Sequence, residues 1–158
     1  MSNGIRKMRK IVIPNDIFFA EAERLIGEGC DTEIFAKGYS MRPFIRSDRT
    51  RVRLSPCDTG LLQRGDVVLF RYRGRHVMHR IANRSGDEFI MAGDGNIGIT
   101  EHCTSADIIA RMTAVITRRG RVISCDSGLW RTASAAWVAL PQFVRRCILG
   151  VLWRIGIK

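Results

Sequence analysis

The sequence predicts a mainly β protein: a small, antiparallel and partly closed β-domain, with a helix before it and amphipathic helices after it. Two observations predict this class. Short apolar runs rich in valine and isoleucine fill the middle of the chain, and turn residues separate them at short intervals. The two ends instead carry apolar residues at helical spacing. We therefore expect an arm and helix over residues 1–31, a β-domain over 32–125 and a basic helical tail over 126–158.

The first predicted elements are an edge strand or arm at 11–13 and a helix that begins at Asn15 or Asp16, either of which can cap it. Gly27 and Gly29 end this helix. Its apolar side chains share one face, which predicts a packing role. They are Phe18, Phe19, Ala22, Leu25 and Ile26.

Short strands are predicted along the whole central region, with tight turns between them. The turns are marked by small or flexible residues at 65–66, 73–74, 85–87 and 118–120. Strands joined by such short turns form an antiparallel sheet. The predicted strands span residues 32–37, 50–54, 67–72, 76–81, 88–91, 107–110 and 112–117.

The charge balance limits the kinds of partner. Lysine and arginine number 26 against 15 acidic residues, so the net charge is +11. Such a charge favours an anionic partner, either nucleic acid or an acidic membrane surface. No run reaches the ~18 uncharged apolar residues of a membrane span, and no apolar core of a secretory leader follows the basic first ten residues. We expect a location in the cytoplasm or at the inner face of a membrane.

The five cysteines are scattered and include no C-x-x-C pair. Their odd number and wide spacing argue against both a disulfide framework and a zinc site, and favour a reducing compartment. No metal and no other cofactor is expected.

A candidate nucleophile, Ser40, lies in the stretch 38–43, Gly-Tyr-Ser-Met-Arg-Pro. Gly38 is free to take a positive φ, and Pro43 stiffens the exit from the turn. Such a frame suits a serine hydroxyl that must be held in a fixed pose for attack. The alternative is an ordinary serine-containing turn.

A candidate general base, His79, lies on the predicted strand 76–81. At a period of two residues, His79 shares a face with Val77 and Ile81, whereas His76 lies on the other face. An imidazole on the apolar face can accept a proton from serine as the neutral base. The alternative is a core histidine satisfied by a main-chain carbonyl.

A candidate orienting acid, Asp94, lies between Gly93 and Gly95. Nucleophile, base and acid would then follow in the order Ser40, His79, Asp94. A Gly-Asp-Gly sequence is also a common tight turn. A cation-binding loop is weakly supported, because no further carboxylates cluster around it.

Four blocks, taken together, are more specific than any one of them. They span residues 38–43, 64–70, 79–81 and 93–96. In this order they resemble the signal peptidase I family, which shares its β-fold with the LexA-like self-cleaving repressors. The resemblance covers roughly residues 36–117, and it implies a serine peptidase of mainly β structure.

The resemblance is to the histidine branch of that family. Most bacterial members and the LexA-like repressors use a lysine base, whereas the endoplasmic-reticulum type uses histidine in an H-R-[VI] block. No lysine lies between Ser40 and the last residue, and His79-Arg80-Ile81 matches the histidine block.

The chain departs from the family pattern at several points. Ser47-Asp48 replaces a Gly-Asp pair, and Gly38 replaces a hydroxyl that in some members helps hold the oxyanion, which leaves main-chain N–H donors such as that of Ser40. The acid stays open between Asp94, Glu101 and Asp107. Without a membrane anchor, cleavage of secretory signals outside the cell is not expected.

The tail predicts a second kind of contact. No acidic residue follows Asp126, and Trp130, Trp137, Val144 and Val151 recur every seven residues. A basic helix with this apolar side can lie on an anionic membrane. Pro141 should kink it or divide it into two helices. The alternative is a helix that covers the β-sheet or a partner protein.

The sequence therefore predicts a serine endopeptidase that acts on a peptide or protein, such as a leader. The main alternative is an inactive relative that binds peptides or a partner. Nucleic-acid binding is less favoured, because there is no helix-turn-helix pattern and no Ala-Gly dipeptide precedes Ser40 as a self-cleavage site.

Overall fold

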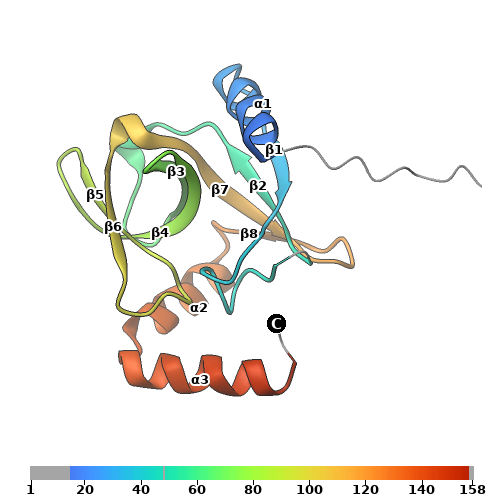
Figure 1. Ribbon diagram of the computed structural model, residues 1–158, viewed down its shortest axis with the longest axis vertical. Helices are drawn as coiled ribbons and strands as arrows, with labels where there is room; N and C mark the ends of the chain where they lie inside the picture. Colours follow the sequence, from blue (N-terminus) through green and yellow to red (C-terminus); the bar gives the residue numbers. More distant parts are fainter. Residues whose placement is uncertain (1–14, 48, 157–158) are drawn as a thin grey trace, which may run out of the picture.

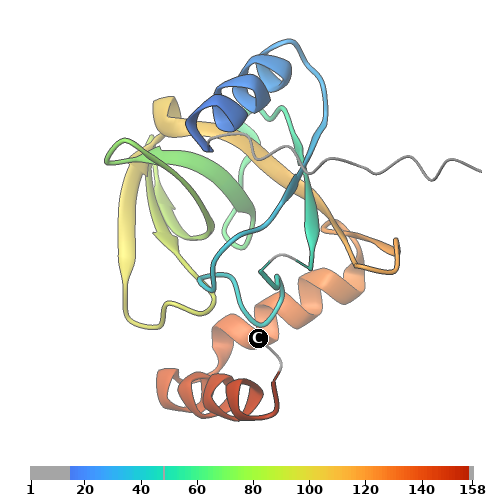
Figure 2. The same ribbon diagram turned by 45° about the vertical axis from the view of Figure 1, so that its right-hand side comes forward.

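The computed structural model of the chain describes residues 15–47 and 49–156 (Figure 1). Within these ranges, eight antiparallel strands form one sheet, with helix α1 at one end and helices α2 and α3 at the other (Figures 1 and 2). The expected mainly β, antiparallel class is confirmed. The sheet is not closed, because β1 and β6 end its hydrogen-bonded path without pairing with each other. The arm predicted at 11–13 lies outside the described residues.

The strand order is β1-β2-β7-β3-β4-β5-β6, and β8 pairs with β7 beside this path. The strands are β1 Thr32–Phe35, β2 Arg51–Ser55, β3 Val67–Tyr72, β4 Arg75–Ser85, β5 Glu88–Ala92, β6 Thr100–Thr104, β7 Ile108–Ile116 and β8 Val122–Ser124. Bulges at Arg53/Leu54, Leu69/Phe70 and Ile81/Asn83 interrupt the register. Each bulge bends its strand, so the sheet curls although its edges stay apart.

Two strands were not predicted, β6 and β8. β6 reads Thr-Glu-His-Cys-Thr and buries only Cys103, so it lacks the apolar alternation that marks a strand. β8 has three residues. The predicted strands 107–110 and 112–117 are one strand, β7, preceded by the 3₁₀ turn η2 at Ser105–Asp107.

Two apolar clusters form the core. The first lies between α1 (Asn15–Gly27) and strands β1, β2, β3 and β7, where Ala22 and Ile26 of α1 are buried and Phe18 and Phe19 pack beside them. The predicted face of this helix is thus confirmed. The second is centred on the fully buried Phe70 and Phe89 of β3 and β5. Burial of a side chain of this size contributes about 1.5–3 kcal/mol.

The tail divides at Pro141 into α2 (Gly128–Ala139) and α3 (Gln142–Arg154), as its proline predicted. The two helices are bent by 114°. Among the described helices, none alone has the length and apolar composition to cross a membrane, and α2 and α3 meet that criterion only as a bent pair. Trp130 and Trp137 are buried against the β-domain, where their rings meet Phe44. The first half of the seven-residue repeat is therefore a packing face.

A polar contact joins α1 to the sheet. The carboxylate of Glu23 accepts hydrogen bonds from Arg71 on β3 and contacts Nε2 of His76 on β4, whose ring stacks on Phe19. The hydrogen bond from Arg71, with a smaller contribution from His76, holds the pKa of Glu23 below its usual value although partial burial opposes this. A carboxyl group whose pKa is lowered by folding stabilises the fold above its unfolded-state pKa.

We expect Glu23→Gln to lower the unfolding free energy by about 1 kcal/mol at pH 7. The deficit should shrink as the pH falls below about 4.3, where the Glu23 carboxyl is protonated in the unfolded wild-type chain. Thermal unfolding of both proteins at pH 7 and pH 3 measures this. Glu21→Gln, which removes an exposed pair with Arg24 on the same helix, is the matched control and should leave the melting temperature unchanged. A deficit that stays constant with pH would contradict this account.

Candidate active site

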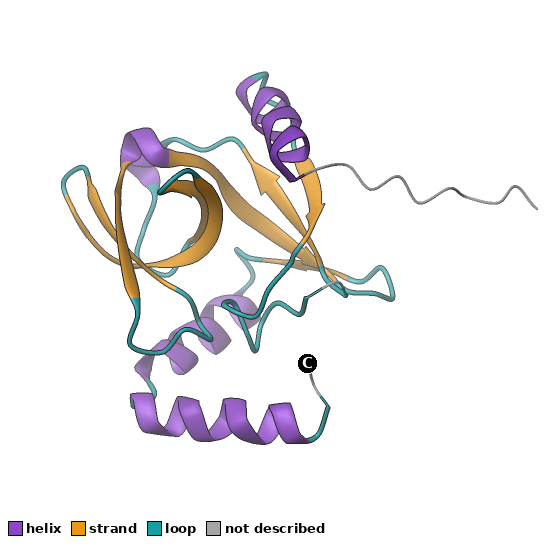
Figure 3. Cartoon of the chain, in the orientation of Figure 1, coloured by secondary structure: helices purple, strands orange, loops and turns teal. Residues whose placement is uncertain are grey.

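Ser40 lies in the loop between β1 and β2, at the end of the sheet that faces α2 and α3 (Figure 3). Gly38 has a φ of 92°, as its place in the turn predicted, and its N–H donates to Oγ of Ser47 at 3.1 Å. The N–H of Ala36 bonds the carbonyl of Thr50 at 3.1 Å and closes the base of the loop. Ser40 itself is partly exposed. The loop is therefore tied at its base, and its serine remains accessible.

The loop that follows β5 packs directly on the serine loop. The N–H of Gly95 donates to the carbonyl of Ser40 at 2.7 Å. A Cβ added at Gly93 would lie 2.6 Å from that carbonyl oxygen and 3.0 Å from Nε2 of His79, and one added at Gly95 would lie 2.6 Å from the carbonyl of Tyr39. These distances leave no room for a side chain. The two glycines thus permit close approach of two main chains, and Ser40 and the imidazole meet at Gly93.

His79 is buried on β4, and its two ring nitrogens face different groups. Nδ1 lies 2.8 Å from Oε2 of Glu101, which comes from β6. Nε2 lies beside Gly93, which the main-chain carbonyl of Ser40 also adjoins. A carboxylate on Nδ1 orients the ring and keeps the proton there, so that Nε2 can accept a proton. This is the arrangement that a general base requires.

Asp94 does not contact His79, which corrects its predicted role as the orienting acid. Its buried carboxylate accepts two hydrogen bonds from the buried guanidinium of Arg80, from Nε at 2.8 Å and from Nη2 at 2.6 Å. Arg80 follows His79 on the strand, so it projects from the opposite face. The carboxylate of Asp107 accepts from the N–H of Thr104 at the start of η2. Of the three candidate acids, only Glu101 contacts the imidazole.

The cross-strand register explains this choice. Ile81 pairs with Met91, and Met91 pairs with Glu101, so the three side chains lie on one face of the sheet. His79 lies on the same face, two residues before Ile81. Glu101 could therefore be identified from the sequence only if strand β6 and its pairing with β5 were already known.

Ser40 and His79 are adjacent, and their side chains are not hydrogen-bonded to each other in the described structure. Catalytic hydrogen bonds are often long without substrate and tighten when it binds. Around the serine, the N–H groups of Gly38 and Arg42 already have acceptors, whereas within the described residues those of Tyr39, Ser40 and Met41 have none. Three successive main-chain donors therefore remain, and those of Ser40 and Met41 are the ones at and after the serine.

Helix α3 contacts the serine loop. The guanidinium of Arg42 lies over the rings of both Tyr39 and Trp153, at 4.0 and 5.1 Å from their centres. Such stacking compensates in part for the burial of a cation. The end of α3 is thereby held against the two residues that flank Ser40 and Met41.

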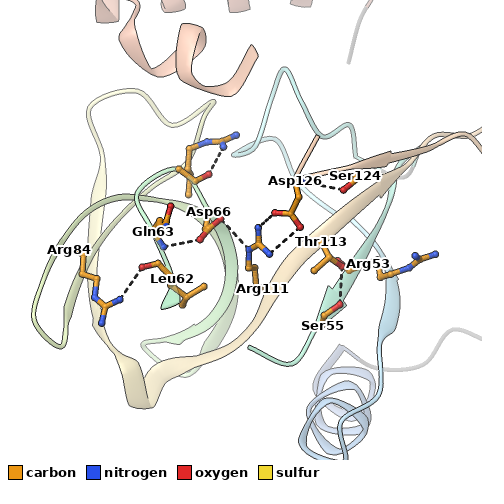
Figure 4. Close-up of polar contacts among 12 residues, drawn as sticks. Arg53, Ser55, Leu62, Gln63, Asp66, Arg84, Arg111, Thr113, Ser124 and Asp126 are labelled. Atoms are coloured by element: carbon orange, nitrogen blue, oxygen red, sulfur yellow. Dashed lines mark hydrogen bonds and ion pairs between the residues drawn. The ribbon is translucent and has the colours of Figure 1, made fainter. Parts of the chain in front are cut away.

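A cavity of about 830 Å³ lies behind this site, between the β-domain and α2. Its wall includes Arg111, which binds Asp66 at 3.2 Å and also Asp126 (Figure 4). The hydrogen bond from Arg111 lowers the pKa of Asp126. Burial raises the pKa of the Cys125 thiol in the same wall to about 12, so this thiol is protonated at neutral pH. Neither Ser40 nor His79 lines the cavity, but Gly93 and Asp94 of the loop after β5 do, so the cavity adjoins the site.

Comparisons of the chain with protein-family models, with curated proteins and with solved structures found no match. In residues 15–47 and 49–156, no group of three or more His, Cys, Asp and Glu side chains is arranged to hold a metal ion.

We expect Asp94→Asn to destabilise the protein by about 3–5 kcal/mol, because it leaves the buried Arg80 guanidinium without its counter-charge. Urea unfolding measures the loss. Glu101→Gln should have a much smaller effect, since its partner is an imidazole that can be neutral. The double variant Arg80→Met/Asp94→Leu should be more stable than the sum of its single changes implies. Equal losses for Asp94→Asn and Glu101→Gln would contradict a mainly structural role for Asp94.

We expect Gly93→Ala to destabilise the fold by about 1–3 kcal/mol, because its Cβ forces the Ser40 carbonyl away from the loop. Gly128→Ala is the matched control, since a Cβ there meets nothing within 4 Å. Thermal unfolding compares the two. A Gly93→Ala protein as stable as Gly128→Ala would show that the loops are not packed as described.

Proposed function

We propose that the protein is a serine peptidase in which Ser40 is the nucleophile, His79 the general base and Glu101 the orienting acid. The contact of Nδ1 of His79 with Glu101, with Nε2 beside Gly93, which the main-chain carbonyl of Ser40 also adjoins, carries this proposal. The proposed substrate is a peptide or protein, such as a leader. The proposal keeps the predicted serine and histidine and replaces Asp94 by Glu101.

The proposed reaction follows from the order of these groups. Nε2 of His79 accepts the proton of the Ser40 hydroxyl as Oγ attacks the peptide carbonyl, and it then returns the proton to the leaving amine. Glu101 stabilises the imidazolium between the two transfers. The N–H groups of Ser40 and Met41 are the candidate donors to the oxyanion. Water then hydrolyses the acyl-enzyme by the same base.

The resemblance to the signal peptidase I family also remains a proposal. The mainly β, antiparallel class supports it in coarse outline. The histidine block, residues 79–81, lies on β4, which pairs with β3. It supplies the proposed base, His79, as the resemblance implies. The Gly-Asp-Gly block serves a different purpose from the one predicted, because its carboxylate binds Arg80 and its glycines admit the serine loop.

A second candidate function is peptide binding without cleavage, as in an inactive relative. The absence of a hydrogen bond between the side chains of Ser40 and His79 in the described structure favours it. Strand β1 is an edge of the sheet, and an extended peptide could pair with its free side. Nucleic-acid binding is the third candidate and has only the net charge of +11 to support it.

We expect a fluorophosphonate probe to label the wild-type protein and not Ser40→Ala, because only an activated serine hydroxyl is acylated at a useful rate. Labelling is followed by intact-mass measurement, which also gives the stoichiometry. Ser47→Ala is the control for a second serine in the same loop. Equal labelling of wild type and Ser40→Ala, or no labelling of a folded wild type, would favour the binding function.

We expect His79→Ala to slow this labelling by about 10²–10⁴-fold, the range for loss of a general base. Glu101→Gln should slow it less, because the amide can still orient the ring although the charge that stabilises the imidazolium is lost. His76→Ala is the matched control on the opposite face of β4, because His76 contacts Glu23 and Phe19 instead of the site. A larger loss of labelling rate for His76→Ala than for His79→Ala would show that His79 is not the base.

A further inference from the structure

Helix α3 carries apolar residues on a half-buried side and on an adjoining exposed side. One face packs toward the molecule through the half-buried Val144, Ile148 and Leu152. The other face carries an apolar stripe at i, i+4, i+7 and i+8, a spacing that places its members side by side. The stripe consists of Phe143, Cys147, Gly150 and Val151. Phe143 is 69% exposed and Val151 is 59% exposed. A surface helix normally turns polar residues to this side, so the stripe suits a contact with an apolar phase.

The charges beside the stripe all have one sign. Arg146 and Arg154 are exposed on the same side of α3, and no acidic residue follows Asp126 in the chain. An anionic surface complements this pattern. A second copy of the chain does not, because it would bring two basic tails together. Nucleic acid would complement the arginines but would leave the apolar stripe uncovered.

We propose that α3 docks on an anionic lipid bilayer. The apolar stripe enters the boundary between headgroups and acyl chains, and Arg146 and Arg154 lie at the level of the phosphates. α2 stays on the β-domain, because Trp130 and Trp137 are buried there and the indole N–H of Trp137 donates to the main-chain carbonyl of Asp94 at 3.1 Å. The bent pair therefore lies on the membrane through one helix and does not cross it.

Docking through α3 also orients the candidate active site. Trp153 of α3 meets Tyr39 at a ring distance of 5.9 Å and stacks with Arg42, so the serine loop adjoins the docked helix. If the proposed peptidase function holds, the preferred substrates are peptides held at an anionic membrane surface. The docking itself does not depend on that function.

Sedimentation of the full-length Ser40→Ala protein with lipid vesicles tests the docking without any contribution from catalysis. We expect binding to vesicles of phosphatidylcholine mixed with phosphatidylserine and little binding to phosphatidylcholine alone. Added salt should weaken it, because the attraction is screened beyond a Debye length of ~10 Å at 0.1 M. Phe143→Glu/Val151→Glu should weaken binding by on the order of 10²-fold, about tenfold for each apolar side chain. Arg146→Gln/Arg154→Gln should weaken it by about fivefold for each charge.

Leu61→Glu is the matched control, because Leu61 is 76% exposed on the 3₁₀ turn η1 (Thr59–Leu61), which is not part of α3. It should bind vesicles as the parent does, and circular dichroism should show that all variants keep their helices. Equal binding to both vesicle types, or equal losses for Leu61→Glu and the α3 variant, would overturn the proposal. Self-association that the α3 variant abolishes, without vesicle binding, would assign the stripe to a second copy and also overturn it.

A fluorophore on Cys147 reports the same event at one position. In a Cys30→Ser/Cys57→Ser background, an environment-sensitive dye on the exposed Cys147 should shift to shorter wavelength when anionic vesicles are added. The matched control is the same dye on the exposed Cys30 in a Cys57→Ser/Cys147→Ser background, which should not shift. Shifts at both positions, or at neither, would rule out docking through this face of α3.

Discussion

The buried ion pair between Arg80 and Asp94 is the contact on which the rest of the site depends. Arg80 also donates to the carbonyl of Gly65 at 2.8 Å, and its guanidinium lies 5.4 Å from the ring centre of Phe44 in the serine loop. The main-chain carbonyl of Asp94 accepts from Trp137 of α2. One pair therefore joins β4, the turn before β3, the loop after β5, the serine loop and α2. Buried charges of this kind persist only when they are paired and hydrogen-bonded, so the pair also specifies one arrangement of these segments.

The candidate active site is built on the other face of the same strand. Because successive residues of a strand project to opposite sides, His79 faces Glu101 and the serine loop while Arg80 faces the structural pair. The bond between the N–H of Gly95 and the carbonyl of Ser40 then sets the serine loop against the imidazole. The proposed catalytic base, His79, and the structural residue Arg80 are thus consecutive in sequence but lie on opposite faces of the sheet.

The amphipathic tail predicted from the sequence consists of two helices that have different roles. α2 buries its tryptophans on the β-domain and on Phe44, and so completes the support of the serine loop. α3 turns away at Pro141 (Figure 2). It retains an exposed apolar stripe beside arginines. The stripe is short, and its helix contacts Tyr39 and Arg42 through Trp153. The stripe proposed to dock on a membrane and the candidate active site are therefore adjacent.

Local patterns in the sequence by themselves determined the mainly β class, the buried face of α1, the hairpin at Arg73-Gly74, the break at Pro141 and the opposite orientations of His79 and His76. These features depend on side-chain period and on turn residues, which act over a few positions. Only the tertiary structure decided that Glu101 contacts His79, that Asp94 binds Arg80 and that the tryptophans of α2 are buried. The polar strand β6 has no local signature, and the bulge at Ile81/Asn83 shifts the register through which Glu101 reaches the face of His79. Pairing between distant strands is set by the packing of the whole sheet, and so the identity of the acid could not be derived from the order of residues along the chain.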